Sequence, residues 1–370
     1  MAEEQYFHEL LEECIRKNAS DLHLTVGRPP ILRIDGVLRS IEKTEVCTPE
    51  FTEKIKNIAV EHAPQIKHLI TEDGGADFSL NFKNLARFRV AIYRQKGCYG
   101  LALRLIPNNI MQFEEIGFQA SQVPRIKYLL DRPHGLILVT GPTGSGKTTT
   151  QASFVDYILD SPRHVLTIED PIEFVHNHKS GIITQREVGV DVPSFREAIM
   201  KGLRSNPNVI LVAEIRDVAT AEATIWAAES GHLVIGTLHT TNASETVTRF
   251  VDVFPPEIRD QIRIQFSISV IAIFAQRLLP RATGRGRVGV FEIMMATPAV
   301  RNLIRERKVE HLPSAIQSSV AEGSCTFDSA LAEQYRAGKI TFEMALMNAF
   351  DPRALREMVE FGIKSRYAHK

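Results

Sequence analysis

The segment of residues 141–148, GPTGSGKT, constrains the fold of this chain more than any other part of the sequence. It fits the pattern G-x-x-x-x-G-K-[ST], in which backbone N–H groups curl around phosphate oxygens, the lysine adds a cation and the threonine ligates Mg²⁺. A strand-like run, residues 136–140, precedes it and a helical pattern follows, which is the context that such a loop requires. The sequence therefore predicts a phosphate site made by Gly141, Pro142, Thr143, Gly144, Ser145, Gly146, Lys147, Thr148 and Thr149.

The residues around this loop alternate between strand-like and helix-like segments. Further strands are expected over residues 165–168, 209–212 and 233–238, with helical patterns between them. Such alternation predicts an α/β domain with a mostly parallel sheet covered by helices. From about residue 297 to the end the pattern is helical, which predicts a helical subdomain there.

The first part of the chain follows a different pattern. A helix is expected over residues 4–18 and another after Pro49, with alternating strands and an Asp35-Gly36 hairpin turn between them. Residues 76–107 have the pattern of further antiparallel strands, so this part predicts a small α+β domain. The residues Pro107-Asn108-Asn109 are of types that favour turns. We therefore expect domains at 1–107 and 116–370, joined by a linker over 108–115.

Three of the expected strands run directly into chemically useful residues, Glu169, Glu214 and His239. In open parallel sheets, ligands bind outside the carboxyl ends of the strands, so these side chains are expected to converge on the phosphate loop. Glu214 follows an apolar strand and is placed to hold the Mg²⁺ shell together with Thr148, or to orient the attacking water. Glu169 is the competing candidate for that water. Phosphoryl transfer depends mainly on such positioning and charge stabilisation.

Composition narrows the class of protein. Lys and Arg total 44, as do Asp and Glu, and a zero net charge disfavours bulk nucleic acid as the main partner. The N-terminus lacks the pattern of a signal peptide, and no apolar run is long enough to span a bilayer, so a cytosolic protein is expected. The cysteines, at positions 14, 47, 98 and 325, are scattered without a CxxC pair, which predicts reduced thiols and no zinc site.

Further motifs occur in a specific order along nearly the whole chain. They are SDLHLTVGRPPILRIDG, RFRVAIYRQ with ALRLIP, GPTGSGKTTT, LTIEDPIEF, ITQREVG, NVILVAEIRD and GHLVIGTLHTTNA, followed by Ala299, Val300, Arg301, Asn302, Leu303, Ile304, Arg305 and Glu306. In content and spacing the chain resembles the secretion and pilus-motor ATPases, particularly the PilT-type retraction ATPases. Ala213 and Val300 depart mildly from that pattern, and the segment TFDSALAEQYRAGKIT is also similar to accessory PilU-type motors.

The resemblance implies a homohexameric, ATP- and Mg²⁺-dependent motor with a PAS-like and a RecA-like domain, acting in pilus retraction on the inner-membrane platform protein at the cytoplasmic base of the pilus. It implies that Lys147 and Thr148 bind phosphate and Mg²⁺, that Glu169 and Glu214 are catalytic acids, and that His239 senses the γ-phosphate, with His232 a weaker candidate. It also implies that Arg89 and Arg104 reach nucleotide in a neighbouring subunit.

Other interpretations stay open on the sequence alone. Pilus-extension and type II secretion ATPases resemble this chain but usually carry a paired-CxxC zinc insertion and a longer N-terminal region. A RecA-like motor that translocates nucleic acid is a second alternative, and a non-catalytic ring subunit is a third. By its spacing, the segment 299–306 is an amphipathic helix with a buried stripe and solvated arginines. The resemblance adds a role in relaying the nucleotide state to the pilus base.

Overall fold

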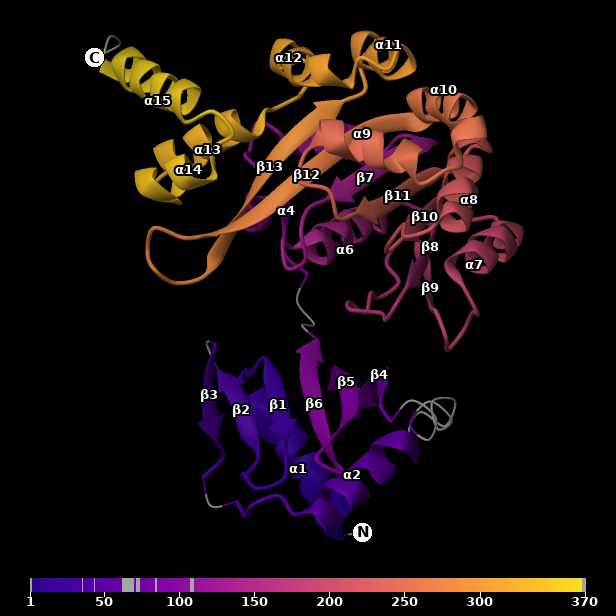
Figure 1. The fold of residues 1–370 in the computed structure, drawn as a ribbon, viewed down its shortest axis with the longest axis vertical. Helices are drawn as coiled ribbons and strands as arrows, with labels where there is room; N and C mark the ends of the chain where they lie inside the picture. Colours follow the sequence, from indigo (N-terminus) through magenta and orange to yellow (C-terminus); the bar gives the residue numbers. More distant parts are fainter. Residues whose placement is uncertain are drawn as a thin grey trace. The chain divides into compact units, whose positions relative to one another are not determined.

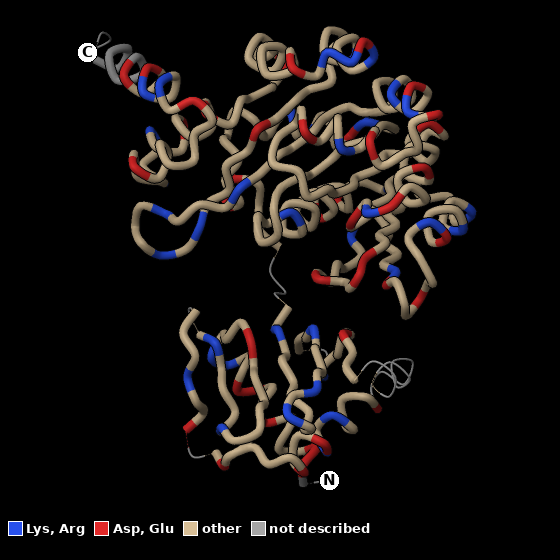
Figure 2. Tube along the Cα trace, in the orientation of Figure 1, with Lys and Arg blue, Asp and Glu red and all other residues tan. Residues whose placement is uncertain are grey.

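The computed structural model describes residues 2–34, 36–42, 44–61, 70, 74–83, 85–106 and 110–367. The chain forms two compact units, residues 1–109 with 171–175 and residues 110–170 with 176–370 (Figure 1). The expected turn residues Asp35, Pro107, Asn108 and Asn109 lie outside the described residues. Basic and acidic residues are interspersed along both units (Figure 2).

The first unit is an α+β fold in which every strand pairing is antiparallel. Its sheet has the order β3-β2-β1-β6-β5-β4. Its elements are α1 (Ala2–Arg16), β1 (Asp21–Leu24), β2 (Ile31–Ile34), β3 (Val37–Ser40), α2 (Pro49–Glu61), β4 (Ala76–Phe82), β5 (Ala86–Gln95) and β6 (Cys98–Ile106). The expected helices and the antiparallel strands are confirmed. The alternation of apolar residues gives the sheet one buried face, except at the edge strand β3, whose four residues are exposed.

The other face of this sheet carries a row of charged side chains that crosses four strands. Arg33, Asp21, Arg104 and Arg89 are successive register partners on β2, β1, β6 and β5, and we call them the arginine row. Asp21 accepts a hydrogen bond from Nε of Arg104 at 3.1 Å and lies 3.5 Å from Nε of Arg33. Burial raises the pKa of Asp21, but its bonds to Ser20 and Arg104 outweigh burial and hold that pKa below its usual value.

The second unit is built on a seven-stranded sheet of order β13-β12-β7-β11-β10-β8-β9, in which only β12 and β13 pair antiparallel. The strands are β7 (Gly135–Thr140), β8 (His164–Glu169), β9 (Ile182–Glu187), β10 (Val209–Val212), β11 (Leu233–Leu238), β12 (Val270–Pro280) and β13 (Arg287–Met295). The helices are α4 (Phe113–Ile116), α5 (Val123–Leu130), α6 (Lys147–Ile158), α7 (Phe195–Gly202), α8 (Val218–Glu229), α9 (Ala243–Asp252), α10 (Arg259–Ser269), α11 (Pro298–Arg305), α12 (Leu312–Ser318), α13 (Phe327–Arg336), α14 (Phe342–Asn348) and α15 (Pro352–Tyr367). This confirms the predicted α/β class.

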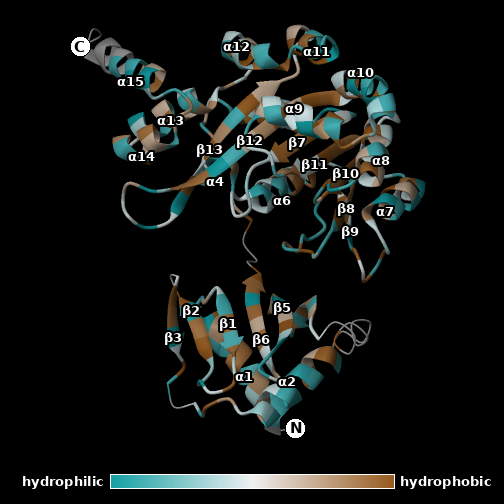
Figure 3. Cartoon of the chain, in the orientation of Figure 1, coloured by the Kyte–Doolittle hydropathy of each residue, from teal (hydrophilic) through white to brown (hydrophobic). Residues whose placement is uncertain are grey.

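Both faces of the second sheet are buried, so its central strands are apolar on both sides (Figure 3). On β7, Ile137 and Val139 pack with α4, α5, α6 and α13, whereas Leu136 and Leu138 pack with α7 to α12 on the opposite face. The fully buried β7 and β11 then end at the same edge, where the phosphate loop begins.

Two features differ from the sequence-based expectation. The structure adds strands β9, β12 and β13, of which β12 begins inside a continuous apolar run whose periodicity does not distinguish strand from helix. The region expected to be a linker up to residue 115 contains α4, and its Phe113 and Ile116 are buried in the core of the second unit. Among the described residues, no helix is both long and apolar enough to cross a bilayer.

The four cysteines give a direct test of this fold. Burial raises the pKa of Cys14 to about 12 and those of Cys47 and Cys325 to about 11, whereas Cys98 lies partly exposed on β6. Since the thiolate is the reactive form, a thiol reagent at neutral pH is expected to label one cysteine rapidly in the native protein and four after denaturation. Cys98→Ser is expected to abolish the rapid phase, and rapid labelling of a second thiol would contradict the packing described.

Candidate active site

The phosphate loop connects β7 to α6, as the sequence predicts, and its glycines have conformations that other residues rarely adopt. Gly141 has φ +150° and Gly146 has φ +90°. A Cβ on Gly141 would lie 2.4 Å from the carbonyl oxygen of Gln276, so only glycine fits between the loop and β12. α6 begins at Lys147, which directs the N–H groups and the positive end of the helix dipole toward the loop.

Lys147 reaches across the loop that precedes it. Its Nζ donates to the carbonyl oxygens of Gly141 at 2.8 Å and Pro142 at 3.3 Å, and lies 3.4 Å from Nδ1 of His239. The cation is therefore held where the loop's N–H groups surround a bound phosphate.

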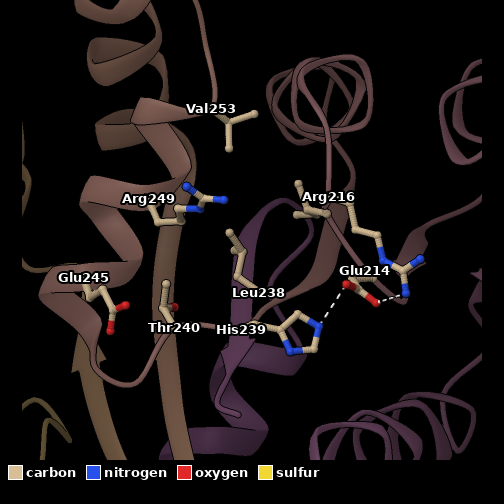
Figure 4. Close-up of a pocket in the computed structure, with 9 residues that line it drawn as sticks. Glu214, Arg216, Leu238, His239, Thr240, Glu245, Arg249 and Val253 are labelled. Carbon is tan, nitrogen blue, oxygen red and sulfur yellow. Dashed lines mark hydrogen bonds and ion pairs between the residues drawn. The ribbon is translucent and has the colours of Figure 1, made fainter. Parts of the chain in front are cut away.

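Glu214 and His239, which follow β10 and β11, meet at this edge as predicted. Nε2 of His239 lies 2.9 Å from Oε1 of Glu214, and Arg216 donates to Oε2 of Glu214 at 2.6 Å (Figure 4). Lys147, His239 and Glu214 thus form a continuous chain of polar contacts between the phosphate loop and the strand β10. His239 uses both of its ring nitrogens in this chain of contacts.

The electrostatics keep Glu214 ionised. Partial burial raises its pKa, but the hydrogen bond and charge of Arg216, together with His239, outweigh burial and hold the pKa below its usual value. Arg216 responds in the opposite direction, since the bond to Glu214 raises the pKa of the guanidinium. At neutral pH this position is therefore a carboxylate next to a fixed cation.

Glu169 ends β8, the neighbour of β10 in the sheet, and is buried. Its Oε1 accepts hydrogen bonds from Oγ1 of Thr167 at 2.6 Å and from Nε2 of Gln185 on β9 at 3.1 Å. These two donors fix the orientation of the carboxyl group, a condition for a group that positions water.

A cavity of about 450 Å³ adjoins His239 and Glu214 (Figure 4). Its walls come from the segment after β10, the end of β11 and α9, and they are Glu214, Ile215, Arg216, Leu238, His239, Thr240, Glu245, Arg249 and Val253. Space for further polar groups therefore exists beside the paired Glu214 and His239.

Some predicted residues lie elsewhere. His232 precedes β11, at the strand end opposite His239, and its Nδ1 lies 3.1 Å from the carbonyl oxygen of Ala227 and 3.2 Å from Oγ of Ser230. Six residues of strand, or about 20 Å at the usual rise, separate it from the nucleotide edge, so His232 does not join this cluster. Arg89 and Arg104 belong to the arginine row of the first unit.

Two residues at the site were not among the candidates from sequence. Arg216, two positions after Glu214, pairs with that carboxylate. It belongs to the NVILVAEIRD motif, and this was the sequence feature from which it could have been predicted. Gln276, fully buried on β12, donates from Nε2 to the carbonyl oxygen of Ser145 at 2.7 Å and so supports the phosphate loop. No local pattern could have singled it out, because its strand lies in an apolar run.

Comparison with known proteins gives the family of this chain. The model of the type II/IV secretion system protein family matches residues 2–344. The chain belongs to the type II/IV secretion system protein family. It is an ATP-hydrolysing member, with the phosphate loop and acidic residues described above.

The relatives of this secretion-system family member include pilus motors. It is 43% identical to the "Type IV pilus retractation ATPase PilT" of Pseudomonas aeruginosa PAO1 over 93% of this chain and 98% of that protein. It is 35% identical to the "Type IV pilus ATPase PilU" of the same strain, over 98% of this chain and 94% of that protein. A crystal structure of the pilus retraction motor PilT with bound ADP superimposes with a TM-score of 0.86, 41% identity and coverage of 95% of this chain and 98% of the other.

Residues 299–305 of the segment 299–306 lie in α11, Glu306 is the C-cap residue, and Pro298 is the first residue of the helix, as expected. Val300 and Ile304 are buried, and Leu303 is partly buried. Arg301 is only partly exposed and is bound by backbone groups, which the simple amphipathic interpretation did not predict. Its guanidinium donates to the carbonyl oxygens of Ser267 at 2.6 Å, of Ile268, and of Ala296 at 3.0 Å, and thereby caps the C-terminal end of α10.

We expect the two arginines of α11 to differ in what they do for stability. Arg301→Ala removes charged hydrogen bonds to three carbonyl groups and is expected to lower the free energy of unfolding by about 2 kcal/mol. Arg305, which is exposed and lies 3.4 Å from Oδ1 of Asn302, is the matched control, and Arg305→Ala is expected to change stability by less than about 0.5 kcal/mol. Thermal or urea unfolding of the purified variants measures both. Equal midpoints for the two variants would show that the cap contributes nothing.

Proposed function

We propose that this protein is a hexameric motor that uses ATP hydrolysis to retract a type IV pilus. The proposal rests on the continuous polar contacts Lys147–His239–Glu214 at the phosphate loop. These contacts occur in a protein that is 43% identical to a pilus retraction ATPase over nearly its full length. The lower identity to PilU, 35%, favours the principal over the accessory type of motor. As in the resemblance noted above, its place of action is the cytoplasmic base of the pilus, on an inner-membrane platform protein.

In this proposal the residues divide the work of hydrolysis. Lys147 binds the β- and γ-phosphates, and the hydroxyl of Thr148 and the ionised carboxylate of Glu214 supply the hard oxygen ligands that suit Mg²⁺. Mg²⁺, when bound, neutralises charge on the phosphates. Glu169, whose orientation is fixed by Thr167 and Gln185, orients the attacking water.

His239 reports the state of the phosphate. Its ring lies between the Lys147 ammonium and the Glu214 carboxylate, so a γ-phosphate that attracts Lys147 alters both contacts of the ring. The ammonium is held by the carbonyl oxygens of Gly141 and Pro142, so a γ-phosphate competes with these two acceptors for it. The resulting change in the contacts of His239 is the signal that the motor passes on in this proposal.

Arg89 and Arg104 act in this proposal on the nucleotide of a neighbouring subunit. Their position in the arginine row, with Arg104 68% exposed in its side chain, leaves guanidinium groups accessible on the open face of the first unit. Two adjacent cations on opposing strands suit a triphosphate, whose charge they would offset.

The function is tested with paired measurements on one variant. Lys147→Ala is expected to reduce ATP hydrolysis by the purified protein to background, because the γ-phosphate loses its cation. A strain carrying this variant in place of the native gene is expected to accumulate surface pili and lose twitching. Arg305→Ala, which leaves the site intact, serves as the control for hydrolysis.

The outcomes separate the alternatives. Bald cells would indicate a pilus-extension ATPase, and normal pili with defective secretion would indicate a type II secretion ATPase. Hydrolysis that rises strongly with single-stranded nucleic acid would favour a nucleic-acid motor. Unchanged hydrolysis by Lys147→Ala would contradict the assignment of the phosphate loop as the site of ATP hydrolysis.

The trans role of the arginines predicts complementation between inactive variants. Lys147→Ala and Arg89→Ala subunits are each expected to be nearly inactive, since arginines that reach a phosphoryl group in trans contribute roughly 10³–10⁵ in rate. Mixed rings contain some sites with an intact loop from one subunit and an intact arginine from its neighbour, so mixing is expected to restore part of the activity. Mixed rings without activity, or full activity at dilutions that yield monomers, would count against a trans arginine.

A further inference from the structure

A buried carboxylate outside the nucleotide site holds the segment that carries His239. Glu292 lies on β13 and is only 9% exposed, and its Oε1 accepts a hydrogen bond from the backbone N–H of Ala243 at 2.7 Å. Burial raises the pKa of Glu292 above its usual value, and the backbone N–H groups of Ala243 and Phe327 oppose that shift. The hydrogen bond from Ala243 to Glu292 therefore joins the first turn of α9 to β13.

The first turn of α9 is four residues from His239, and that segment has little freedom. Asn242 caps α9 by accepting from the N–H of Glu245 at 2.8 Å, and Oε2 of Glu245 accepts from the N–H of Thr241 at 2.8 Å. These two bonds order the residues on either side of Ala243, and the bond from Ala243 to Glu292 attaches the same turn to β13.

A second set of contacts joins the segment to β7. Oγ1 of Thr240, directly after His239, lies 2.7 Å from Oγ1 of Thr246 on α9. Thr246 in turn lies 3.4 Å from Oγ1 of Thr140, the last residue before Gly141. All three threonines are buried. The Thr240 contact fixes the segment against β7, whereas the Glu292 contact fixes it against β13.

We propose that Glu292 is a positioning residue of the ATPase site: its carboxylate fixes the start of α9 and thereby keeps His239 between Lys147 and Glu214. The inference rests on the proposed role of His239 in hydrolysis. Glu292 itself touches no residue of the phosphate loop among its recorded contacts. Its effect on turnover must therefore pass through the segment from His239 to Ala243.

The chain provides a matched control for a purely structural carboxylate. Asp328 is also buried, and its two oxygens accept from the backbone N–H groups of Phe350 and Asp351, each at 2.8 Å. Like Glu292, it is a buried carboxyl group that accepts from the backbone. Its partners precede α15 and do not lie on the segment that carries His239. The charge of Asp328 raises the pKa of Glu292, so Asp328→Asn is expected to favour the ionised form of Glu292 and to leave its bond to Ala243 intact.

The test compares Glu292→Gln with Asp328→Asn in the full-length protein. Each substitution keeps the side-chain size, removes the negative charge and leaves one oxygen that accepts from the backbone, so both are expected to lower the thermal midpoint. Glu292→Gln is expected to reduce kcat for ATP hydrolysis by roughly ten- to a hundred-fold with KM changed less than about three-fold, since a small misplacement near a reacting group has this effect. Asp328→Asn is expected to keep kcat within about two-fold of the native value.

A double variant identifies the path of the effect. In a His239→Ala background, adding Glu292→Gln is expected to cause no further loss of kcat, because the group that Glu292 positions is already absent. Independent, multiplicative losses would overturn the inference, as would equal kcat for Glu292→Gln and Asp328→Asn. Native turnover in His239→Ala alone would instead overturn the role of His239 on which the inference rests, while Lys147→Ala tests the ATPase assignment separately.

Discussion

The hydrogen-bonded chain from Lys147 through His239 to Glu214 is the interaction on which the active site depends. It exists because β7, β10 and β11 run parallel in register, so that three segments distant in sequence end at one edge. Parallel strands place their carboxyl ends together, and the fold thereby converts strand order into a cluster of polar groups. Both faces of the sheet are apolar and buried, so the polar groups gather where the parallel strands end.

The groups that surround this chain are buried and hydrogen-bonded, which gives the site its rigidity. Gln276 from β12 supports the phosphate loop at Ser145, Thr246 joins Thr240 to Thr140, and Glu292 from β13 binds the start of α9. The antiparallel pair β12 and β13 therefore does more than extend the sheet, because it supplies two of the three supports. A rigid surround reduces the reorganisation that charge movement at the phosphate would otherwise require.

The sequence predicted the parts of this site that depend on local pattern. Glycine spacing located the phosphate loop, and apolar runs located the strands whose ends carry Glu169, Glu214 and His239. Sequence gave no indication of Gln276 or Glu292, since both lie in strands of an apolar region where helix and strand have the same pattern. Arg301 shows a second limit. Helical spacing places it on the polar face of α11, but whether that face meets water or the carbonyl groups of α10 is decided by tertiary packing.

The arginine row of the first unit has an unequal composition, three guanidinium groups to one carboxylate. Attraction between exposed charges is screened over about 8 Å at physiological ionic strength, and much less in groups that are buried. The contacts among Lys147, His239 and Glu214 are also partly exposed, since the side chain of His239 is 47% exposed and that of Glu214 is 20% exposed. In the arginine row, Arg104 is 68% exposed and Arg89 is 37% exposed. Salt is therefore expected to weaken most the attraction between Arg104, the most exposed of these groups, and any anion that binds the row.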